Sequence, residues 1–78
     1  MMTSISREEI IRQLVDSWPS ALVARSESGH FSGGVVSPRY MANLDSAGLG
    51  PPQRVRFCGK VAYPTSIFAC WLADRMIK

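Results

Sequence analysis

The chain has 78 residues, of which 46% are hydrophobic, and its nine basic and six acidic side chains leave a net charge of +3. This length allows one small domain near the lower limit for a self-sufficient core, and the apolar content argues against disorder. No apolar run approaches the roughly 18 residues of a membrane span, and the N-terminus lacks a signal peptide's apolar stretch, so we expect a cytoplasmic protein without a membrane partner.

The sequence offers little for metal or catalytic chemistry. Two cysteines, Cys58 and Cys70, are too few for a disulfide framework, so we expect both to be free thiols. His30 is the only histidine and no Cys-x-x-Cys pair occurs, which argues against a metal site. His30 and Ser32 lack an orienting carboxylate, and there is no glycine-rich phosphate loop. We therefore expect neither a cofactor nor enzymatic activity.

A capping box predicts the first helix. Ser6 suits the N-cap position, and Glu9 follows three residues later, directly before an apolar run. Apolar side chains then recur at helical spacing: Ile10, Ile11, Leu14, Val15 and Trp18. Pro19 closes the segment because proline cannot continue a helix. We expect a helix over about residues 7–17.

The segment from about residue 21 to 47 predicts a pair of helices joined by a turn. Ser26 can cap one short turn that runs through Phe31 and ends before two glycines. Ser37 is a favourable N-cap, and Pro38 is favourable at the first helical position. We expect the second helix to begin at Pro38 and to end near residue 47.

The second of these helices has two unlike faces. At about 100° per residue, Met41 and Leu44 point to one side, and Tyr40 and Asp45 lie at the borders. The opposite side holds Arg39, Ala42, Asn43 and Ser46. Arginine reads guanine, asparagine reads adenine and alanine contacts the thymine methyl group, so this face suits the major groove of DNA. The polar face of any amphipathic surface helix is the alternative interpretation.

Residues 53–63 predict a β-hairpin. The first strand alternates basic and apolar side chains: Arg54, Val55, Arg56 and Phe57. Alternation puts the two arginines on one face, opposite the two apolar side chains, and makes the arginines candidates for phosphate contact. A turn at Cys58 and Gly59 reverses the chain.

The last segment predicts a helix over about residues 66–76. Pro64 ends the hairpin, and Thr65 or Ser66 can cap the helix. The apolar side chains of this helix complete the expected core. That core comprises Ile10, Leu14, Leu22, Met41, Leu44, Val55, Phe57, Phe68 and Leu72. A core of this size predicts marginal stability.

The charge is unevenly distributed along the chain. From residue 25 to 60, five basic and two acidic side chains leave the whole excess of +3, while the rest of the chain is balanced. Phosphate binding depends on such clustering. A short helix followed directly by a basic hairpin is the layout of a winged helix-turn-helix. A solvated basic face is the alternative.

The sequence "FSGGVVSPRYMANLDSAGLGPPQRVRFCGKVAYPTSIFACWL" resembles the small excisionase-type regulators of phages and integrative elements, which are winged helix-turn-helix proteins related to the DNA-binding heads of MerR-like regulators. The resemblance covers roughly residues 21 to 75. It implies binding to double-stranded DNA, with the helix at 38–46 in the major groove and the hairpin at 54–63 against the backbone or minor groove. It also implies a role either in recombination directionality or in transcription of a mobile element.

The resemblance also implies roles for individual residues. Arg39, Tyr40 and Asn43 would contact the major groove or adjacent phosphates. The contacts of the wing would come from Arg54, Arg56 and Lys60. Phosphate contacts at the start of the first helix of the pair would come from Arg25 and Ser26, because helix N-termini favour anions. Ser37 and Ser46 complete the candidate DNA-binding set.

The sequence as a whole predicts one mostly helical α+β domain over residues 1–78: a winged helix-turn-helix with a two-stranded wing and flanking N- and C-terminal helices. No heptad seam is present, so we expect a monomer in solution that assembles cooperatively on DNA, with an integrase or recombinase as a further partner. The alternative function is a protein-interaction adaptor on the same scaffold, which docks on a recombinase or polymerase through the helix at 7–17.

Overall fold

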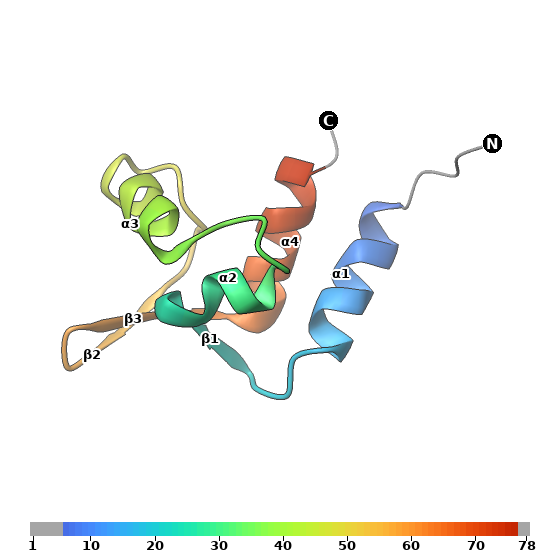
Figure 1. Ribbon diagram of the computed structural model, residues 1–78, viewed down its shortest axis with the longest axis horizontal. Helices are drawn as coiled ribbons and strands as arrows, with labels where there is room; N and C mark the ends of the chain where they lie inside the picture. Colours follow the sequence, from blue (N-terminus) through green and yellow to red (C-terminus); the bar gives the residue numbers. More distant parts are fainter. Residues whose placement is uncertain (1–5, 77–78) are drawn as a thin grey trace.

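The sheet joins segments that lie far apart in the sequence. In the computed structural model, which describes residues 6–76, β1 (Leu22–Ala24) pairs antiparallel with β3 (Lys60–Pro64), and β3 pairs antiparallel with β2 (Val55–Phe57). The strand order is therefore β1-β3-β2 (Figure 1). β2 and β3 confirm the predicted hairpin, whereas β1 adds a third strand that the sequence did not predict.

A two-residue turn connects β2 to β3. Cys58 has a φ of 50° and Gly59 has a φ of 78°, so both residues have the positive φ of a type I′ turn. The twist of this turn matches the twist of the flanking strands, which keeps the end of the hairpin narrow. The predicted turn position is confirmed.

The two faces of the sheet have different surroundings. Val23 and Tyr63 are opposed across β1 and β3, and both are completely buried. Val55 is opposed to Ala62, which neighbours Tyr63 in β3 and therefore points to the other face. On that outer face Val55 is 43% exposed and Phe57 is 75% exposed. The prediction that both belong to the core is wrong, because alternation separates two faces without saying which one is covered.

α4 (Thr65–Met76) follows β3 directly and begins one residue earlier than predicted. Thr65 anchors the start of this helix to the segment before β1. Its backbone N–H donates to the carbonyl of Ala21 at 2.8 Å, and its hydroxyl donates to the carbonyl of Ser20 at 2.7 Å. Neither bond is a helix cap, so the first turn of α4 is held by a neighbouring chain segment.

The core lies between the inner face of the sheet and the helices. Its buried apolar residues are Val23, Phe31, Val36, Met41, Tyr63, Phe68, Ala69, Leu72 and Ala73. Phe68 is central, with ring centroids 5.2 Å from Phe31 and 4.8 Å from Tyr63. Three predicted core residues are confirmed: Met41, Phe68 and Leu72. Three others are only half-buried: Ile10, Leu14 and Leu44. Leu22, like Val55 and Phe57, is exposed.

α1 (Arg7–Asp16) covers the core from outside. The Ser6 hydroxyl accepts a hydrogen bond from the backbone N–H of Glu9 at 3.1 Å, which confirms the predicted N-cap. The helix packs along α4 (Figure 1), and an ion pair between Arg7 and Asp74 joins the two. No residue of α1 is fully buried.

Two short helical segments follow β1. η1 (Arg25–Glu27) is a 3₁₀ turn, and α2 (Ser28–Phe31) continues from it. The prediction that Ser26 caps this segment is wrong, because Ala24 occupies the N-cap position and Ser26 lies inside η1. No side chain among residues 6–76 caps η1 or α2, and the hydroxyl of the buried Ser28 donates to the carbonyl of Arg25 at 2.7 Å. The chain enters this segment directly from a strand that the sequence did not reveal.

α3 (Pro38–Ser46) has well-defined ends. The Ser37 hydroxyl accepts a hydrogen bond from the backbone N–H of Tyr40 at 3.1 Å, as predicted. At the other end, Gly48 has a φ of 75°, its N–H donates to the Asp45 carbonyl, and the next N–H donates to the carbonyl of Leu44 at 2.9 Å. These two bonds form a Schellman motif, which ends the helix and turns the chain back toward β2.

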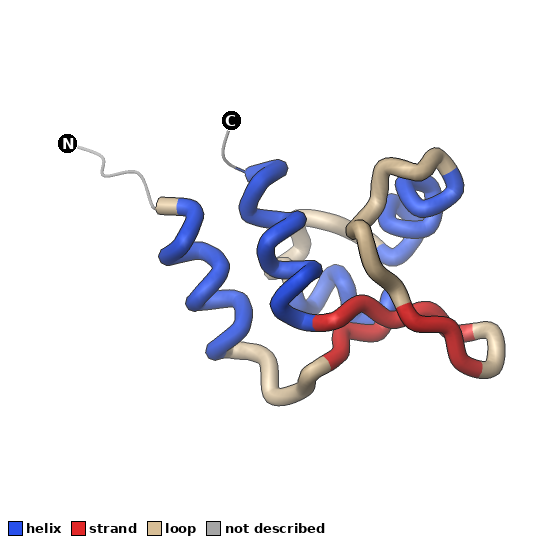
Figure 2. The backbone as a smooth tube through the Cα atoms, turned by 180° about the vertical axis from the view of Figure 1, so that it is seen from behind, coloured by secondary structure: helices blue, strands red, loops and turns tan. Residues whose placement is uncertain are grey.

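Residues 6–76 thus form four α-helices and a three-stranded antiparallel sheet, an α+β arrangement that is mostly helical, as predicted. α3 and the β2–β3 hairpin lie at one end of the long axis, and α1 lies at the other (Figures 1 and 2). None of the helices in this range is both long enough and apolar enough to cross a membrane.

Candidate nucleic-acid interface

One side of α3 packs against the rest of the protein, and the opposite side is exposed to solvent. Met41 is fully buried and Asp45 is 8% exposed, whereas the side of Arg39, Asn43 and Ser46 is exposed. The predicted division of the helix into an inner and an outer face is therefore confirmed for these residues. Asp45 was predicted at the border and instead lies inside.

A buried carboxylate connects α3 to two other elements. Asp45 Oδ2 accepts hydrogen bonds from Arg25 Nη2 and from the Tyr63 hydroxyl, each at 2.6 Å. Arg25 Nε also donates to the Tyr63 hydroxyl at 3.2 Å. η1, α3 and β3 each contribute one of these three side chains, which we call the Asp45 network. Arg25, a candidate phosphate contact from the sequence, is thus engaged inside the protein.

The environment of the Asp45 network keeps its two donors protonated. Burial raises the pKa of the Tyr63 hydroxyl, and the bond to Asp45 adds to this, while the bond from Arg25 acts in the opposite direction. The hydrogen bond to Tyr63 and the pairing with Asp45 raise the pKa of the Arg25 guanidinium. Tyr63 therefore remains a neutral donor and Arg25 remains charged.

The second oxygen of Asp45 has a different environment. Asp45 Oδ1 has no hydrogen-bond partner among the described residues, and Arg54 Nη1 lies 3.7 Å from it. Gly50 packs against this oxygen so closely that a Cβ atom on it would lie 1.9 Å from Oδ1. The loop after α3 therefore depends on the absence of a side chain at Gly50.

The end of the β2–β3 hairpin carries one basic residue on each face. Arg56 is opposed to Val61, and so shares the inner face of the sheet, while Lys60 is opposed to Phe57 on the outer face. Both basic side chains are exposed. Arg54 lies just before β2, and its side chain is 37% exposed.

The basic residues of the chain differ in whether they have internal partners. Five have one: Arg7 with Asp74, Arg12 with Glu9 and Asp16, Arg25 and Arg54 with Asp45, and Arg75 with the Leu49 carbonyl. Three form no ion pair or side-chain hydrogen bond within residues 6–76: Arg39, Arg56 and Lys60. All three lie on α3 or on the hairpin, at the same end of the molecule (Figure 1).

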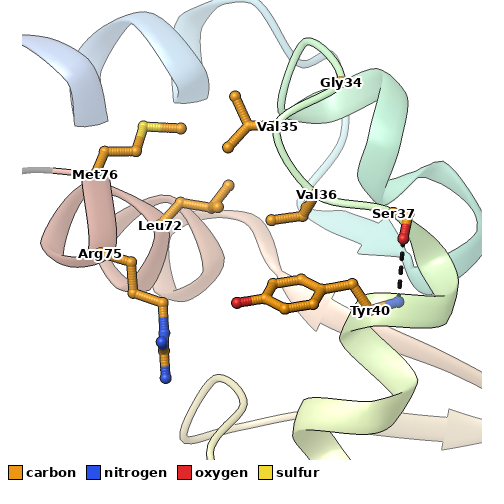
Figure 3. A pocket seen from close by; sticks show the side chains of 8 residues that line it. All are labelled: Gly34, Val35, Val36, Ser37, Tyr40, Leu72, Arg75 and Met76. Atoms are coloured by element: carbon orange, nitrogen blue, oxygen red, sulfur yellow. Dashed lines mark hydrogen bonds between the residues drawn. The ribbon is translucent and has the colours of Figure 1, made fainter.

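The remaining candidate residues are spread more widely. Ser26 and Ser37 are exposed, and the Ser37 hydroxyl is used by the α3 cap. Tyr40 is 44% exposed, and its ring extends toward Leu72 and Arg75 of α4 across a pocket of about 370 Å³ (Figure 3). The lining of this pocket comprises Gly34, Val35, Val36, Ser37, Tyr40, Leu72, Arg75 and Met76.

Three residues important for this region were not recognised as such from the sequence. The sequence predicts Asp45 at a border of the helix and Phe57 in the core, and it predicts no packing role for Gly50. Asp45 is the only acidic side chain between Arg39 and Arg54, and this is the available signal for it. No local pattern identified Gly50, because its close contact with Asp45 arises from the path of the loop.

Comparison with known proteins gives no relative: no protein-family model, no curated protein and no solved structure matches the chain.

Proposed function

We propose that the chain is a small winged helix-turn-helix protein that binds double-stranded DNA, with α3 in the major groove and the β2–β3 hairpin as the wing. The observation that carries this proposal is the location of Arg39, Arg56 and Lys60. They are the basic residues without internal partners in the described part of the chain, and they lie together on the two elements that the proposal brings to DNA. Binding to phosphates requires such available cations.

The geometry of α3 supports a reading role for its exposed side. Met41 and Asp45 hold the inner side, so the outer side can face a groove without exposing the core. Arg39 and Asn43 on that side are types that hydrogen-bond to guanine and adenine. In this proposal Arg25 positions α3 through Asp45 and does not contact phosphate.

The biological role that we propose follows the resemblance to excisionase-type regulators: recombination directionality or transcriptional control in a mobile element. Both roles require the same complex with DNA. Because only three cations are available, we expect weak binding to DNA. Each phosphate contact contributes about −0.9 to the slope of log affinity against log salt concentration. With Arg39 at a base, the two phosphate contacts of Arg56 and Lys60 give a slope of about −1.8, which is about a 12-fold loss of affinity between 50 and 200 mM salt.

A salt titration tests the proposal. Fluorescence anisotropy is measured with a random duplex and with the DNA that flanks the gene, for the wild type, Arg39→Ala and Arg12→Ala. Arg12 is the control, because it is exposed on α1 and paired with Glu9. We expect tighter binding to the flanking DNA, lost in Arg39→Ala and kept in Arg12→Ala. Absence of binding to either duplex at low salt contradicts the proposal.

A second function, that of a protein-interaction adaptor, is favoured by the exposure of α1. None of its residues is fully buried, and a pocket of about 350 Å³ lies between α1 and α2. Its lining includes Ile10, Gln13, Leu14 and Phe31. In this case neither duplex binds, and Arg12→Ala weakens binding to a recombinase or polymerase while Arg39→Ala does not.

A further inference from the structure

Phe57 occupies an unusual position for a large apolar side chain. It is 75% exposed, more than any other large hydrophobic residue that the structure describes, and it directly precedes the two-residue turn of the hairpin. Its ring takes part in none of the aromatic contacts found within residues 6–76. Packing of the fold therefore gives no reason for a phenyl ring at this position.

The charges around Phe57 show which kind of surface the hairpin fits. Lys60 is opposed to Phe57 on the outer face, and Arg56 lies on the inner face. A hairpin that lay flat on the sugar–phosphate backbone of one DNA strand would need basic side chains on one face only. A hairpin that enters a groove has a row of phosphates on each side. One available cation on each face fits the second arrangement.

We propose that Phe57 enters the minor groove beside the α3 site and acts as an apolar wedge that opens a base step, an inference that rests on the proposed DNA-binding function. Phenylalanine inserted from the minor groove unstacks neighbouring base pairs and bends the duplex toward the major groove. With α3 in the major groove, this bend closes the duplex around α3. Phe57 is the last residue of β2 before the turn, so it lies at the end of the hairpin that leads into the groove, while Lys60 and Arg56, on the two faces, lie close to the phosphates of the two groove walls.

Val55 provides the matched control for this proposal. It lies on the same strand and the same outer face as Phe57, but it is 43% exposed and is farther from the turn. A protein partner that covered the whole outer face would contact Val55 and Leu22 as well as Phe57. A wedge depends on Phe57 alone. Exposure of Phe57 also means that its replacement does not remove core packing.

The experiment uses a 30-base-pair duplex with 2-aminopurine at pyrimidine–purine steps and a dye at each end, at low salt. Anisotropy gives affinity, 2-aminopurine fluorescence reports unstacking, and energy transfer between the dyes reports bending. We expect the wild type to increase 2-aminopurine fluorescence severalfold and to bring the duplex ends closer. Phe57→Ala should lose both signals while affinity falls less than about tenfold and the salt slope is kept. Phe57→Leu should keep part of both signals, and Val55→Ala should keep both.

The outcomes separate this inference from the function on which it rests. If the wild type binds without unstacking, or if Phe57→Ala unstacks as well as the wild type, the wedge is wrong and DNA binding stands. Equal losses in Phe57→Ala and Val55→Ala also overturn the wedge, and indicate a contact made by the whole outer face. If the wild type does not bind at low salt, both the proposed function and the wedge are wrong.

Discussion

Tyr63 donates a hydrogen bond of 2.6 Å to the carboxylate of Asp45, and this contact joins the central strand of the sheet to the buried side of α3. Arg25 completes the arrangement from η1. The orientation of α3 relative to the hairpin therefore depends on a polar contact as well as on apolar packing. Because polar contacts have directional geometry, this network restricts the angle at which α3 leaves the core.

Tyr63→Phe tests the strength of this contact. The substitution keeps the buried ring and removes the hydroxyl, so it should lower the free energy of unfolding by about 1–2 kcal/mol. The corresponding decrease in Tm is about 4–16 °C for a domain of this size. Urea and thermal unfolding measure both quantities. Tyr40→Phe is the control, because the Tyr40 hydroxyl makes no hydrogen bond within residues 6–76, and an equal loss in both variants would contradict the assignment.

The same hydroxyl predicts a loss of stability at alkaline pH. Burial, with a further contribution from Asp45, raises the pKa of Tyr63 above its ordinary value of 10.0. The neutral phenol is thus favoured by the fold. Its contribution to stability is complete below the unfolded-state pKa and is lost as the pH rises through the folded-state pKa. Urea midpoints measured from pH 8 to above 11 should fall more steeply for the wild type than for Tyr63→Phe. Parallel curves would show that Tyr63 is not responsible.

Gly50→Ala should destabilise the chain by about 1–3 kcal/mol, because the added methyl group would overlap Asp45 Oδ1. Either the loop or the carboxylate must move. Gly29→Ala is the matched control, since its Cβ would lie 3.4 Å from the nearest atom, the carbonyl oxygen of Val36, and the expected change is within about 0.5 kcal/mol. Urea unfolding distinguishes the two. Equal effects would mean that the close approach at Gly50 is not limiting.

Under the proposed function, Arg54 and Arg56 should contribute unequally to DNA binding. Arg54 lies 3.7 Å from Asp45 Oδ1, whereas Arg56 has no partner among the described residues. Arg56→Ala should therefore reduce the magnitude of the salt slope by about 0.9, the value of one phosphate contact. Arg54→Ala should reduce it by less. Salt titrations of both variants on one duplex provide the comparison, and a larger effect of Arg54→Ala would contradict it.

Local patterns predicted most of the elements correctly. Ser6 and Ser37 each accept the predicted cap hydrogen bond, and the turn at Cys58 and Gly59 lies where it was expected. Such features depend on residues within three or four positions of one another, so they can be read from one segment. The inner position of Met41 was likewise predictable from helical periodicity.

Features that depend on distant segments were not predictable in this way. β1 is only three residues long, and pairing with β3 defines it. Without that strand, Ser26 looked like the start of a helix. The sequence does not show which face of the sheet the helices cover. The prediction that Phe57 lies in the core is wrong for this reason. Asp45 is buried because Arg25 and Tyr63 reach it from other elements.

The separation of α3 into two sides has a practical consequence for protein engineering. Met41 and Asp45 attach the helix to the scaffold, and the side chains of Arg39, Asn43 and Ser46 point away from it. These three positions can be randomised together in a combinatorial library with little loss of folded variants. A chain this short could then be selected for new targets, with the attachment positions left unchanged.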